Sequence, residues 1–350
     1  MLYQWINKSF DISPMALVAL EGLAVALLVF AAAVIALKII IPILRRHKAN
    51  QPIHEALANH SVKAGTPTMG GIGFVIAFLF VLLLWIILEV AGVLGGMDKS
   101  RLVVFAYIIL LGVFNSLVGV VDDIAKLKRK QNGGLSPTQK LVLQFVFAIA
   151  FVAVMATSRN LTTSVIIPFT GYTLELGFFA YPLYVVAIVG FVNSTNITDG
   201  LDGLASSVGI TVASAVLFTS CLISDRYTGV ISGALIGALC GFLVFNHYPA
   251  KVFMGDTGSL FIGAVIIGCG IASGHVIAVM IMGMVFILDI LSSFMQTTCY
   301  KLTKKRIFKC APVHHHFEKI GWREPGIVCL FVIVSLIFCV LGLTGVILSL

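Results

Sequence analysis

The stretch ALVALEGLAVALLVFAAAVIALKIIIPIL, residues 16–44, decides the fold of this 350-residue chain. It is almost entirely apolar and contains only two charged residues, Glu21 and Lys38. About 20 consecutive apolar residues allow a helix to cross the hydrocarbon core of a bilayer. Because this run is longer than the apolar region of a cleaved signal peptide, we expect it to stay in the protein as a first spanning helix.

The rest of the chain repeats this pattern. Apolar residues make up 59% of the chain and charged residues 11%, whereas a soluble domain carries roughly 25% charged residues, so a soluble enzyme is excluded. The apolar runs are continuous and do not alternate with polar residues, which excludes a transmembrane β-barrel. We predict an all-α polytopic integral membrane protein in which residues 1–350 form one transmembrane domain. The ten predicted spans are 16–44, 69–95, 101–121, 138–157, 179–196, 203–222, 229–246, 258–274, 276–300 and 325–349.

The basic residues are unevenly distributed among the loops. Of the 23 Lys and Arg, eighteen lie in or beside loops one, three, five, seven and nine, and the other five lie at the N-terminus or near even-numbered loops. Lys and Arg concentrate in cytoplasmic loops, so we predict that the odd loops are cytoplasmic and that both termini lie outside. The net charge of +8 then reflects contact with anionic headgroups, and no nucleic-acid partner is expected.

Acidic residues also gather on the predicted cytoplasmic side. Asp122 and Asp123 end the third predicted span. Two adjacent carboxylates at a helix C-terminus face the negative end of the helix dipole and repel each other. A divalent cation or a bound proton would relieve this repulsion. Alternatively, Lys126 and Lys128 neutralise the pair without any ligand.

Polar side chains recur at steps of three in the fifth loop, NSTNITDGLDG (residues 193–203). Steps of three keep side chains on one slowly rotating face of a helix, and unpaired polar groups at membrane depth are costly. The loop therefore predicts a binding surface, with Asp202 as an N-cap of the sixth span as the alternative. The residues in question are Asn193, Asn196, Asp199 and Asp202.

The seventh loop, FNHYPAKVFMGDTGS (residues 245–259), ends where the eighth span begins. The N–H groups after Gly255 would face an anion, as helix N-termini commonly do. Asp256 would repel a phosphate unless a cation lay between them, and Mg²⁺ binds one or two carboxylates together with phosphate oxygens. We therefore interpret Asp256 as a magnesium ligand, with a simple helix cap as the alternative.

The ninth loop contains three consecutive histidines, His314, His315 and His316. Neighbouring side chains diverge and zinc sites space their ligands, so we expect these histidines to bind phosphates or sugar hydroxyls. Loop one adds an amine and hydroxyls in KAGTPT (residues 63–68). Asp289 lies deep in the ninth span and is a functional candidate because of its depth, although the sequence identifies no partner for it.

Five strings on the predicted cytoplasmic side resemble the polyprenyl-phosphate N-acetylhexosamine-1-phosphate transferases. Within that superfamily, the first and last strings are similar to the phospho-N-acetylmuramoyl-pentapeptide transferases of bacterial peptidoglycan synthesis. The resemblance extends over nearly the whole chain, and no motif position departs from the pattern. The strings are TPTMGG (66–71), DDIAKLK (122–128), NITDGLDGLA (196–205), FMGDTGSL (253–260) and APVHHHFE (311–318).

This resemblance implies transfer of phospho-N-acetylmuramoyl-pentapeptide from its UDP conjugate to undecaprenyl phosphate, giving lipid I and UMP. It also implies Mg²⁺ as cofactor, the bacterial cytoplasmic membrane as location and a homodimer. By the same analogy, Asp256 holds Mg²⁺, Asp122 deprotonates the lipid phosphate and Asp123 completes the catalytic set. The resemblance also implies that the uridine lies near Gly200, Leu201, Asp202 and Phe253. The expected substrate-binding residues are Lys63, Thr68, Lys126, Lys140, Asn193, Asn196, Asp199, Gly200, Leu201, Asp202, Phe253, Gly255, His314, His315 and His316.

Two other functions stay open at the level of sequence. A related transferase would use a different UDP-N-acetylhexosamine, although the triple histidine argues against it. A secondary transporter would also have about ten spans, but it would place polar residues near the bilayer midplane instead of at one interface. The residues do not decide between direct attack by the lipid phosphate and a covalent intermediate on an aspartate, and we favour direct attack. They also leave open the third residue of the peptide and the route of the lipid.

Overall fold

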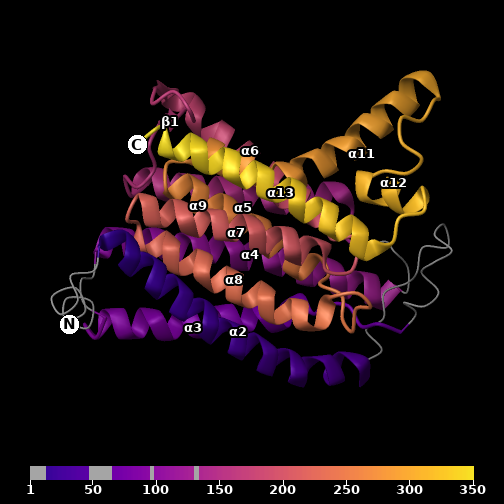
Figure 1. Cartoon of the computed structure of the whole chain (residues 1–350), viewed down its shortest axis with the longest axis horizontal. Coiled ribbons are helices and arrows are strands. Elements are labelled where there is room, and N and C mark those ends of the chain that lie inside the picture. The colour runs from indigo at the N-terminus through magenta and orange to yellow at the C-terminus, as the bar shows by residue number, and fades with distance from the viewer. Residues whose placement is uncertain (1–12, 47–64, 95–97, 130–133) are drawn as a thin grey trace.

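Helices make up most of the chain in a computed structural model that describes residues 13–46, 65–94, 98–129 and 134–350. The long helices lie side by side in one bundle, and α11 projects away from it (Figure 1). The helices are α2 (Pro14–Arg46), α3 (Gly71–Val90), α4 (Lys99–Arg129), α5 (Pro137–Thr157), α6 (Ala180–Thr198), α7 (Leu204–Leu222), α8 (Arg226–Asn246), α9 (Asp256–Ala272), α10 (Val276–Met282), α11 (Met284–Thr303), α12 (Val313–Lys319) and α13 (Glu324–Ile347).

The ten predicted spans all coincide with apolar helices. In the described part of the chain, eight helices are long and apolar enough to cross a membrane, and α10 with α11 would give a ninth. Helix α9 is equally apolar but has only 17 residues. The structure therefore supports a helical multi-pass membrane protein, while the side of the membrane on which each loop lies stays a prediction.

The prediction of one continuous ninth helix over 276–300 is wrong. The chain breaks at Gly283, and α10 and α11 meet there at an angle of 72°. A Cβ on Gly283 would overlap with the ring of Phe191 in α6, so the break occurs where α6 leaves no room for a side chain. Helix α11 consequently leaves the bundle and carries the ninth loop with it.

A small hairpin is the other departure from the predicted all-α fold. Strands β1 (Ser164–Ile166) and β2 (Thr173–Glu175) pair antiparallel, with Val165 opposite Leu174. The 3₁₀ turn η2 (Gly177–Phe179) then leads into α6. Three-residue strands are too short to produce an alternating pattern that stands out from a loop.

Small residues allow the central helices to approach one another closely, as is usual in membrane bundles. Gly233 and Gly237 of α8 face the backbone of Gly22 and Ala26 in α2, and a Cβ on either α8 glycine would overlap with that backbone. The same device operates between α4 and α9. A Cβ on Gly119 would overlap with the peptide group between Asp256 and Thr257, so this glycine lets α4 lie directly against the N-terminus of α9.

Backbone pairing also joins the first and seventh loops. Gly70 and Gly71 donate to the carbonyls of Phe253 and Met254 at 2.8 and 2.9 Å, and Phe253 donates to the carbonyl of Pro67 at 2.8 Å. Two of the five motifs are therefore held together by main-chain hydrogen bonds, close to the start of α9.

Candidate active site

The paired carboxylates Asp122 and Asp123 lie inside α4 and are both 3% exposed. Helix α4 continues to Arg129, so the prediction that the pair ends the helix, at the negative end of its dipole, is wrong. The apolar pattern stops at residue 121, but the helix continues. Its last two turns carry polar side chains of the candidate site. Mutual repulsion of the pair is instead offset by separate partners.

Asp123 caps the N-terminus of α9. Its carboxylate accepts hydrogen bonds from the backbone N–H of Asp256 (3.2 Å), the backbone N–H of Thr257 (3.1 Å) and the Thr257 hydroxyl (2.7 Å). A helix N-terminus leaves N–H groups without intrahelical partners, and here a carboxylate of α4 satisfies two of them. Gly255 precedes the helix with φ of +73°, a conformation that suits glycine.

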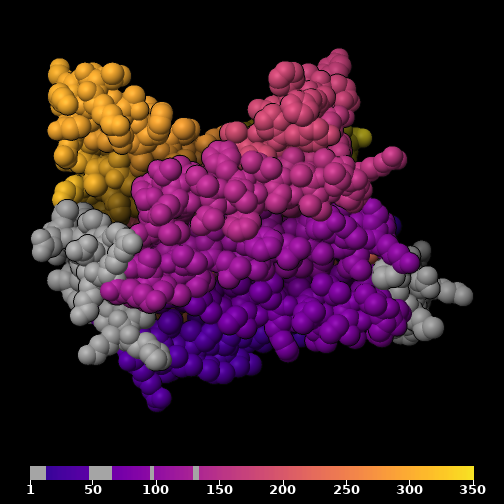
Figure 2. Space-filling model, turned by 180° about the vertical axis from the view of Figure 1, so that it is seen from behind, coloured from indigo at the N-terminus to yellow at the C-terminus, as the bar shows by residue number. Residues whose placement is uncertain are grey.

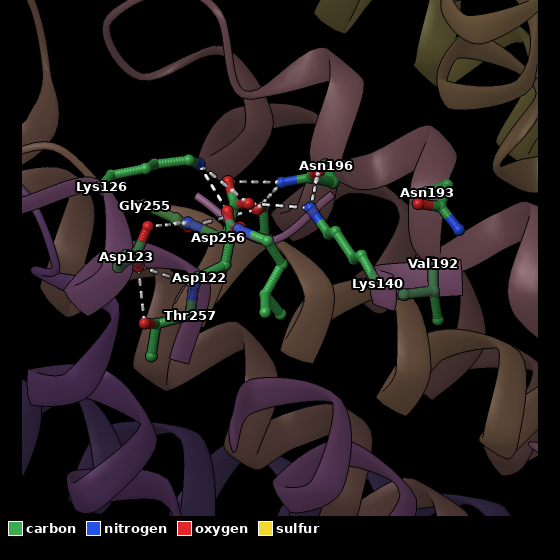
Figure 3. A network of polar contacts seen from close by, with 12 residues as sticks. Asp122, Asp123, Lys126, Lys140, Val192, Asn193, Asn196, Gly255, Asp256 and Thr257 are labelled. Carbon is green, nitrogen blue, oxygen red and sulfur yellow. Dashed lines mark hydrogen bonds and ion pairs between the residues drawn. The ribbon is translucent and has the colours of Figure 1, made fainter. Parts of the chain in front are cut away.

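Two ammonium groups converge on one oxygen of Asp256. Lys126 Nζ lies 3.1 Å and Lys140 Nζ 2.7 Å from Asp256 Oδ2. The other oxygen, Oδ1, accepts a hydrogen bond from Asn196 Nδ2 at 3.0 Å. Figure 3 shows Asp256 between the two lysines, which reach it from opposite sides. Helices α4, α5, α6 and α9 therefore each contribute a side chain to one polar cluster.

Asp122 is held by its own helix and by the start of α5. Its Oδ2 forms an ion pair with Lys126 Nζ at 2.7 Å, one helical turn on, and its Oδ1 accepts from the backbone N–H of Leu135 at 2.6 Å. Lys126 thus links Asp122 to Asp256. Both oxygens of the predicted base are engaged in this arrangement.

Three carboxylates stand close enough to share a metal ion. One oxygen each from Asp122, Asp123 and Asp256 lie within 4.8 Å of one another. Carboxylate oxygens are the ligands that Mg²⁺ prefers, and Lys126 and Lys140 leave one of the three negative charges uncompensated. The donor set therefore fits a hard divalent cation, and the site comprises three acidic residues where the sequence singled out Asp256.

The two asparagines of the fifth loop point in different directions. Asn196 donates to Asp256 and to Ser259 Oγ (2.8 Å) and accepts from Lys140 (2.7 Å). Asn193 lies apart from this cluster (Figure 3) and donates to Gln144 Oε1 of α5 at 2.7 Å. A three-residue step turns a helix by less than one full turn, which is why the two side chains diverge.

Asp199 follows α6 and lies near the acidic cluster. Burial raises its pKa well above the usual range, and the negative charges of Asp256, Asp123 and Asp202 raise it further. The protonated form of Asp199 is accordingly favoured in the folded protein.

Asp202 connects loops instead of capping a helix. Its Oδ2 accepts from the backbone N–H of Ala250 at 2.9 Å, and its own N–H donates to Glu324 Oε2 at 3.3 Å. The N-cap of α7 is Gly203, with φ of +75°, so the alternative role of Asp202 as a cap is wrong. The fifth, seventh and ninth loops meet at this residue.

The three histidines lie on the short helix α12 and differ in their partners. His314 Nδ1 is 2.7 Å from Asp289 Oδ2, and His315 Nδ1 is 3.0 Å from Glu318 Oε2. His316 Nδ1 instead accepts from the backbone N–H of Lys309 at 3.1 Å and so fixes the shape of the loop. Carboxylates thus orient two of the three rings.

The remaining predicted binding residues lie around this cluster. Thr68 and Leu201 are buried, and Phe253 is half-buried beside the paired first loop. Gly200 packs against the ring of His314, where a Cβ would overlap with Nε2. Lys63 lies outside the described residues.

Comparison with known proteins assigns the chain to a family. The model of "Glycosyl transferase family 4" matches residues 105–274, and "Phospho-N-acetylmuramoyl-pentapeptide-transferase signature 1" matches residues 63–75. The phospho-N-acetylmuramoyl-pentapeptide-transferase of Clostridium botulinum is 39% identical over 91% of this chain and 95% of its own length. The enzymes of the same name from Shouchella clausii and Clostridioides difficile are 40% and 35% identical, over 91% and 92% of this chain and 96% of each relative. This chain belongs to the phospho-N-acetylmuramoyl-pentapeptide-transferase family.

The candidate site also contains residues that the sequence did not single out. Gln144 accepts a hydrogen bond from Asn193, and Ser259 accepts one from Asn196. Glu318 pairs with Nδ1 of His315. Asn246 joins the fifth and seventh loops, since it accepts from the N–H of Gly203 (3.1 Å) and donates to the carbonyl of Val252 (2.9 Å). The sequence signal for such a residue is a polar side chain inside an apolar helix, as with Gln144. Which residue it pairs with depends on how the helices pack.

Proposed function

We propose that this chain transfers phospho-N-acetylmuramoyl-pentapeptide from its UDP conjugate to undecaprenyl phosphate, giving lipid I and UMP. The observation that carries the proposal is the convergence of Asp122, Asp123, Asp256, Lys126 and Lys140 from three helices onto one buried cluster. Phosphoryl transfer needs such a cluster, because charge on the transferring group and on the leaving nucleotide must be neutralised. Membership of the family supports the choice of substrates.

The reaction joins two phosphates. An oxygen of the lipid phosphate attacks the phosphorus that carries the sugar, a new P–O bond forms, and the bond from that phosphorus to the oxygen bridging to UMP breaks. The electron pair of the broken bond leaves on UMP. We favour this direct attack over a covalent intermediate on Asp256, and isolation of a phospho-N-acetylmuramoyl adduct on Asp256, formed without lipid acceptor, would contradict it.

The acidic residues and lysines take different parts in this reaction. Asp122 accepts the proton of the lipid phosphate, and this requires its ion pair with Lys126 to open. Opening this pair lets Lys126 neutralise phosphate oxygens, and Lys140 does so from its position beside Asp256. Asp123 keeps the N-terminus of α9, and with it Asp256, in position.

We assign Mg²⁺ to Asp256 together with Asp123 and leave Asp122 as the proton acceptor; one oxygen from each of the three lies within 4.8 Å of the others, and the donor set fits the ion. When bound, the ion supplies positive charge to the diphosphate of the donor. A deep position between α4 and α9 protects the acidic residues from competing water, which strengthens their hold on a cation.

An apolar cavity along α6 offers a place for the isoprenoid chain. It has a volume of about 520 Å³ and lies between α6 and the bent pair α10 and α11. Its lining is apolar apart from a few side chains, and Ser194, next to Asn193 in α6, is the lining residue closest in sequence to the site. Figure 2 shows the notch between the projecting α11 and the segment around the hairpin. A lipid chain held there would lie against α6, the helix whose last turn carries Asn196.

This function places the site at the cytoplasmic face of the bacterial inner membrane, where a soluble, anionic nucleotide sugar is available. Helix α2 begins and α13 ends at the end of the bundle opposite α12 (Figure 1). If the site faces the cytoplasm, both of these helix ends lie outside, and this stays a prediction. A homodimer is the assembly that the family resemblance implies, and it stays a prediction.

Release of UMP by the purified chain tests the proposal. UDP-N-acetylmuramoyl-pentapeptide and undecaprenyl phosphate should give UMP and lipid I only when Mg²⁺ is present. Asp256→Ala and Asp122→Asn should abolish this release, whereas Glu175→Gln, in the exposed strand β2, should leave it unchanged. Full activity in both site variants would remove the assignment. A panel of other UDP-N-acetylhexosamines tests the related transferase activity, and equal rates with them would favour that alternative.

A further inference from the structure

A buried carboxylate outside the acidic cluster has a specific partner. Asp289 of α11 and His314 of α12 are both fully buried, and Asp289 Oδ2 lies 2.7 Å from His314 Nδ1. The backbone N–H of His314 also points at Asp289 Oδ1, at a longer 3.5 Å. The bend at Gly283 makes this pair possible, because it turns α11 out of the bundle and towards the ninth loop.

The pair fixes the imidazole of His314. A carboxylate only accepts hydrogen bonds, so Nδ1 must carry a proton to donate to it. A carboxylate on one ring nitrogen sets both the tautomer and the orientation of the ring. Nε2 is therefore the ring atom of His314 that stays available for another partner.

Nε2 of His314 is aimed at the loop after α6. It is buried and has no hydrogen-bond partner within the described residues, and a Cβ added to Gly200 would overlap with it. A buried polar atom without a partner costs roughly 1–3 kcal/mol. A ligand that donates to or accepts from Nε2 at the fifth loop would remove this cost.

We propose that Asp289 is a positioning residue of the transferase, which holds His314 so that Nε2 contacts the nucleotide end of the donor substrate. The neighbouring loop residues Gly200, Leu201 and Asp202 are those that the family resemblance associates with uridine. Asp289 itself touches no substrate and acts through His314. This inference rests on the proposed function, because it takes a uridine nucleotide as the ligand.

The contact that orients the His314 ring differs from the contact that attaches α12 to α11. Ser292, one turn further along α11, accepts from the backbone N–H of Val313 at 2.9 Å and donates to the carbonyl of Asp289. Ser292→Ala therefore loosens the start of α12 but leaves the carboxylate on Nδ1. It is the matched control for variants of Asp289.

A double-mutant cycle on UMP binding tests the proposal. Asp289→Asn should raise the Kd for UMP about tenfold, the lower end of what loss of a carboxylate that orients a histidine costs. In the His314→Ala background, Asp289→Asn should have no further effect, because the residue acts only through that ring. Ser292→Ala should change thermal stability and leave the Kd unchanged. Additive effects of Asp289→Asn and His314→Ala, or an unchanged Kd in Asp289→Asn, would overturn the proposal.

A spectroscopic measurement tests the orientation without any substrate. In chain labelled with ¹⁵N-histidine, the signal that His314→Ala removes should show a proton on Nδ1. Asp289→Ala should release this proton to exchange between the two nitrogens. A His314 ring without a proton on Nδ1 in the unmodified chain would overturn the proposal. Failure of the proposed function would look different, because the unmodified chain would then release no UMP from the UDP donor.

Discussion

Lys140 Nζ lies 2.7 Å from Asp256 Oδ2 and also 2.7 Å from Asn196 Oδ1. One amine at the start of α5 thus joins the first residue of α9 to the last turn of α6. Since Asn196 also donates to the second oxygen of Asp256, the three side chains form a closed set of contacts. The position of Asp256 therefore depends on two helices that are distant from it in sequence.

We expect Lys140→Met to lower kcat by roughly 10²–10³, the cost typical of removing one group that stabilises transition-state charge. The substitution removes an ammonium group that the proposed mechanism supplies to the phosphates. The control is Lys128→Met, which removes a basic residue of the DDIAKLK string (122–128) whose side chain is exposed. Initial rates of UMP release measure both. Equal losses in the two variants would show that only the general positive charge of this face matters.

Asp123→Asn should destabilise the protein even without metal. It weakens the cap on α9, and loss of a capping side chain costs about 1 kcal/mol. It should also reduce the rise in melting temperature on addition of Mg²⁺, because a metal that binds the folded state stabilises it. Thermal unfolding in detergent, with and without Mg²⁺, measures both effects.

Thr257→Val is the comparison for this substitution. It removes one hydrogen bond to Asp123 but keeps all three carboxylates. Its melting temperature should fall, while the rise caused by Mg²⁺ should stay as in the unmodified chain. If Mg²⁺ stabilises Asp123→Asn fully, Asp123 is not part of the metal site.

The raised pKa of Asp199 predicts that the stability of the protein depends on pH. Its pKa is raised in the folded state by burial and by neighbouring carboxylates. A raised pKa means that the contribution of Asp199 to stability is complete below the ordinary pKa and is lost as the pH rises through the raised value. The melting temperature of the unmodified chain should therefore fall, relative to Asp199→Asn, as the pH increases through that window. Parallel melting curves at every pH would contradict the raised pKa.

The sequence predicts the helices of this fold much better than their ends and bends. Apolar runs locate the apolar helices of the described residues, eight of them long enough to span a membrane and a ninth formed by α10 with α11, because burial in lipid requires apolar side chains. They fail at Asp122, where the helix continues although the pattern stops, and at Gly283, where the helix breaks although the pattern continues. Both depend on contacts outside the local pattern. Asp122 pairs with Lys126 and with the backbone before α5, Asp123 binds the start of α9, and Phe191 of α6 excludes a side chain at Gly283.

Much of the acidic cluster was also predictable, since its residues lie in strings that resemble a known family. The partners of those residues were not. Asp289 looked unpaired in a straight helix, and only the bend of α11 brings it to His314. Gln144 lies 49 positions from Asn193, and a hydrogen bond over that distance depends on the packing of α5 against α6. The apolar pattern along one helix does not show which residues of two different helices form such a pair.

Gly200→Ala should weaken UMP binding about as much as Asp289→Asn. The backbone at Gly200 does not have a positive φ, so alanine fits its conformation, and the change acts only through its Cβ. That Cβ would overlap with Nε2 of His314. The ring cannot turn aside at low cost, because Asp289 holds its other nitrogen at 2.7 Å. Either the fifth loop or α12 must therefore shift.

Gly326→Ala is the matched control for this change, since a Cβ there meets no atom within 4 Å. It should leave the Kd for UMP unchanged. In combination with His314→Ala, which removes the obstructing ring, Gly200→Ala should bind UMP as His314→Ala alone does. If Gly200→Ala weakens binding further in that background, the loop itself contacts the nucleotide, and the close packing of Gly200 on His314 is not what determines the affinity.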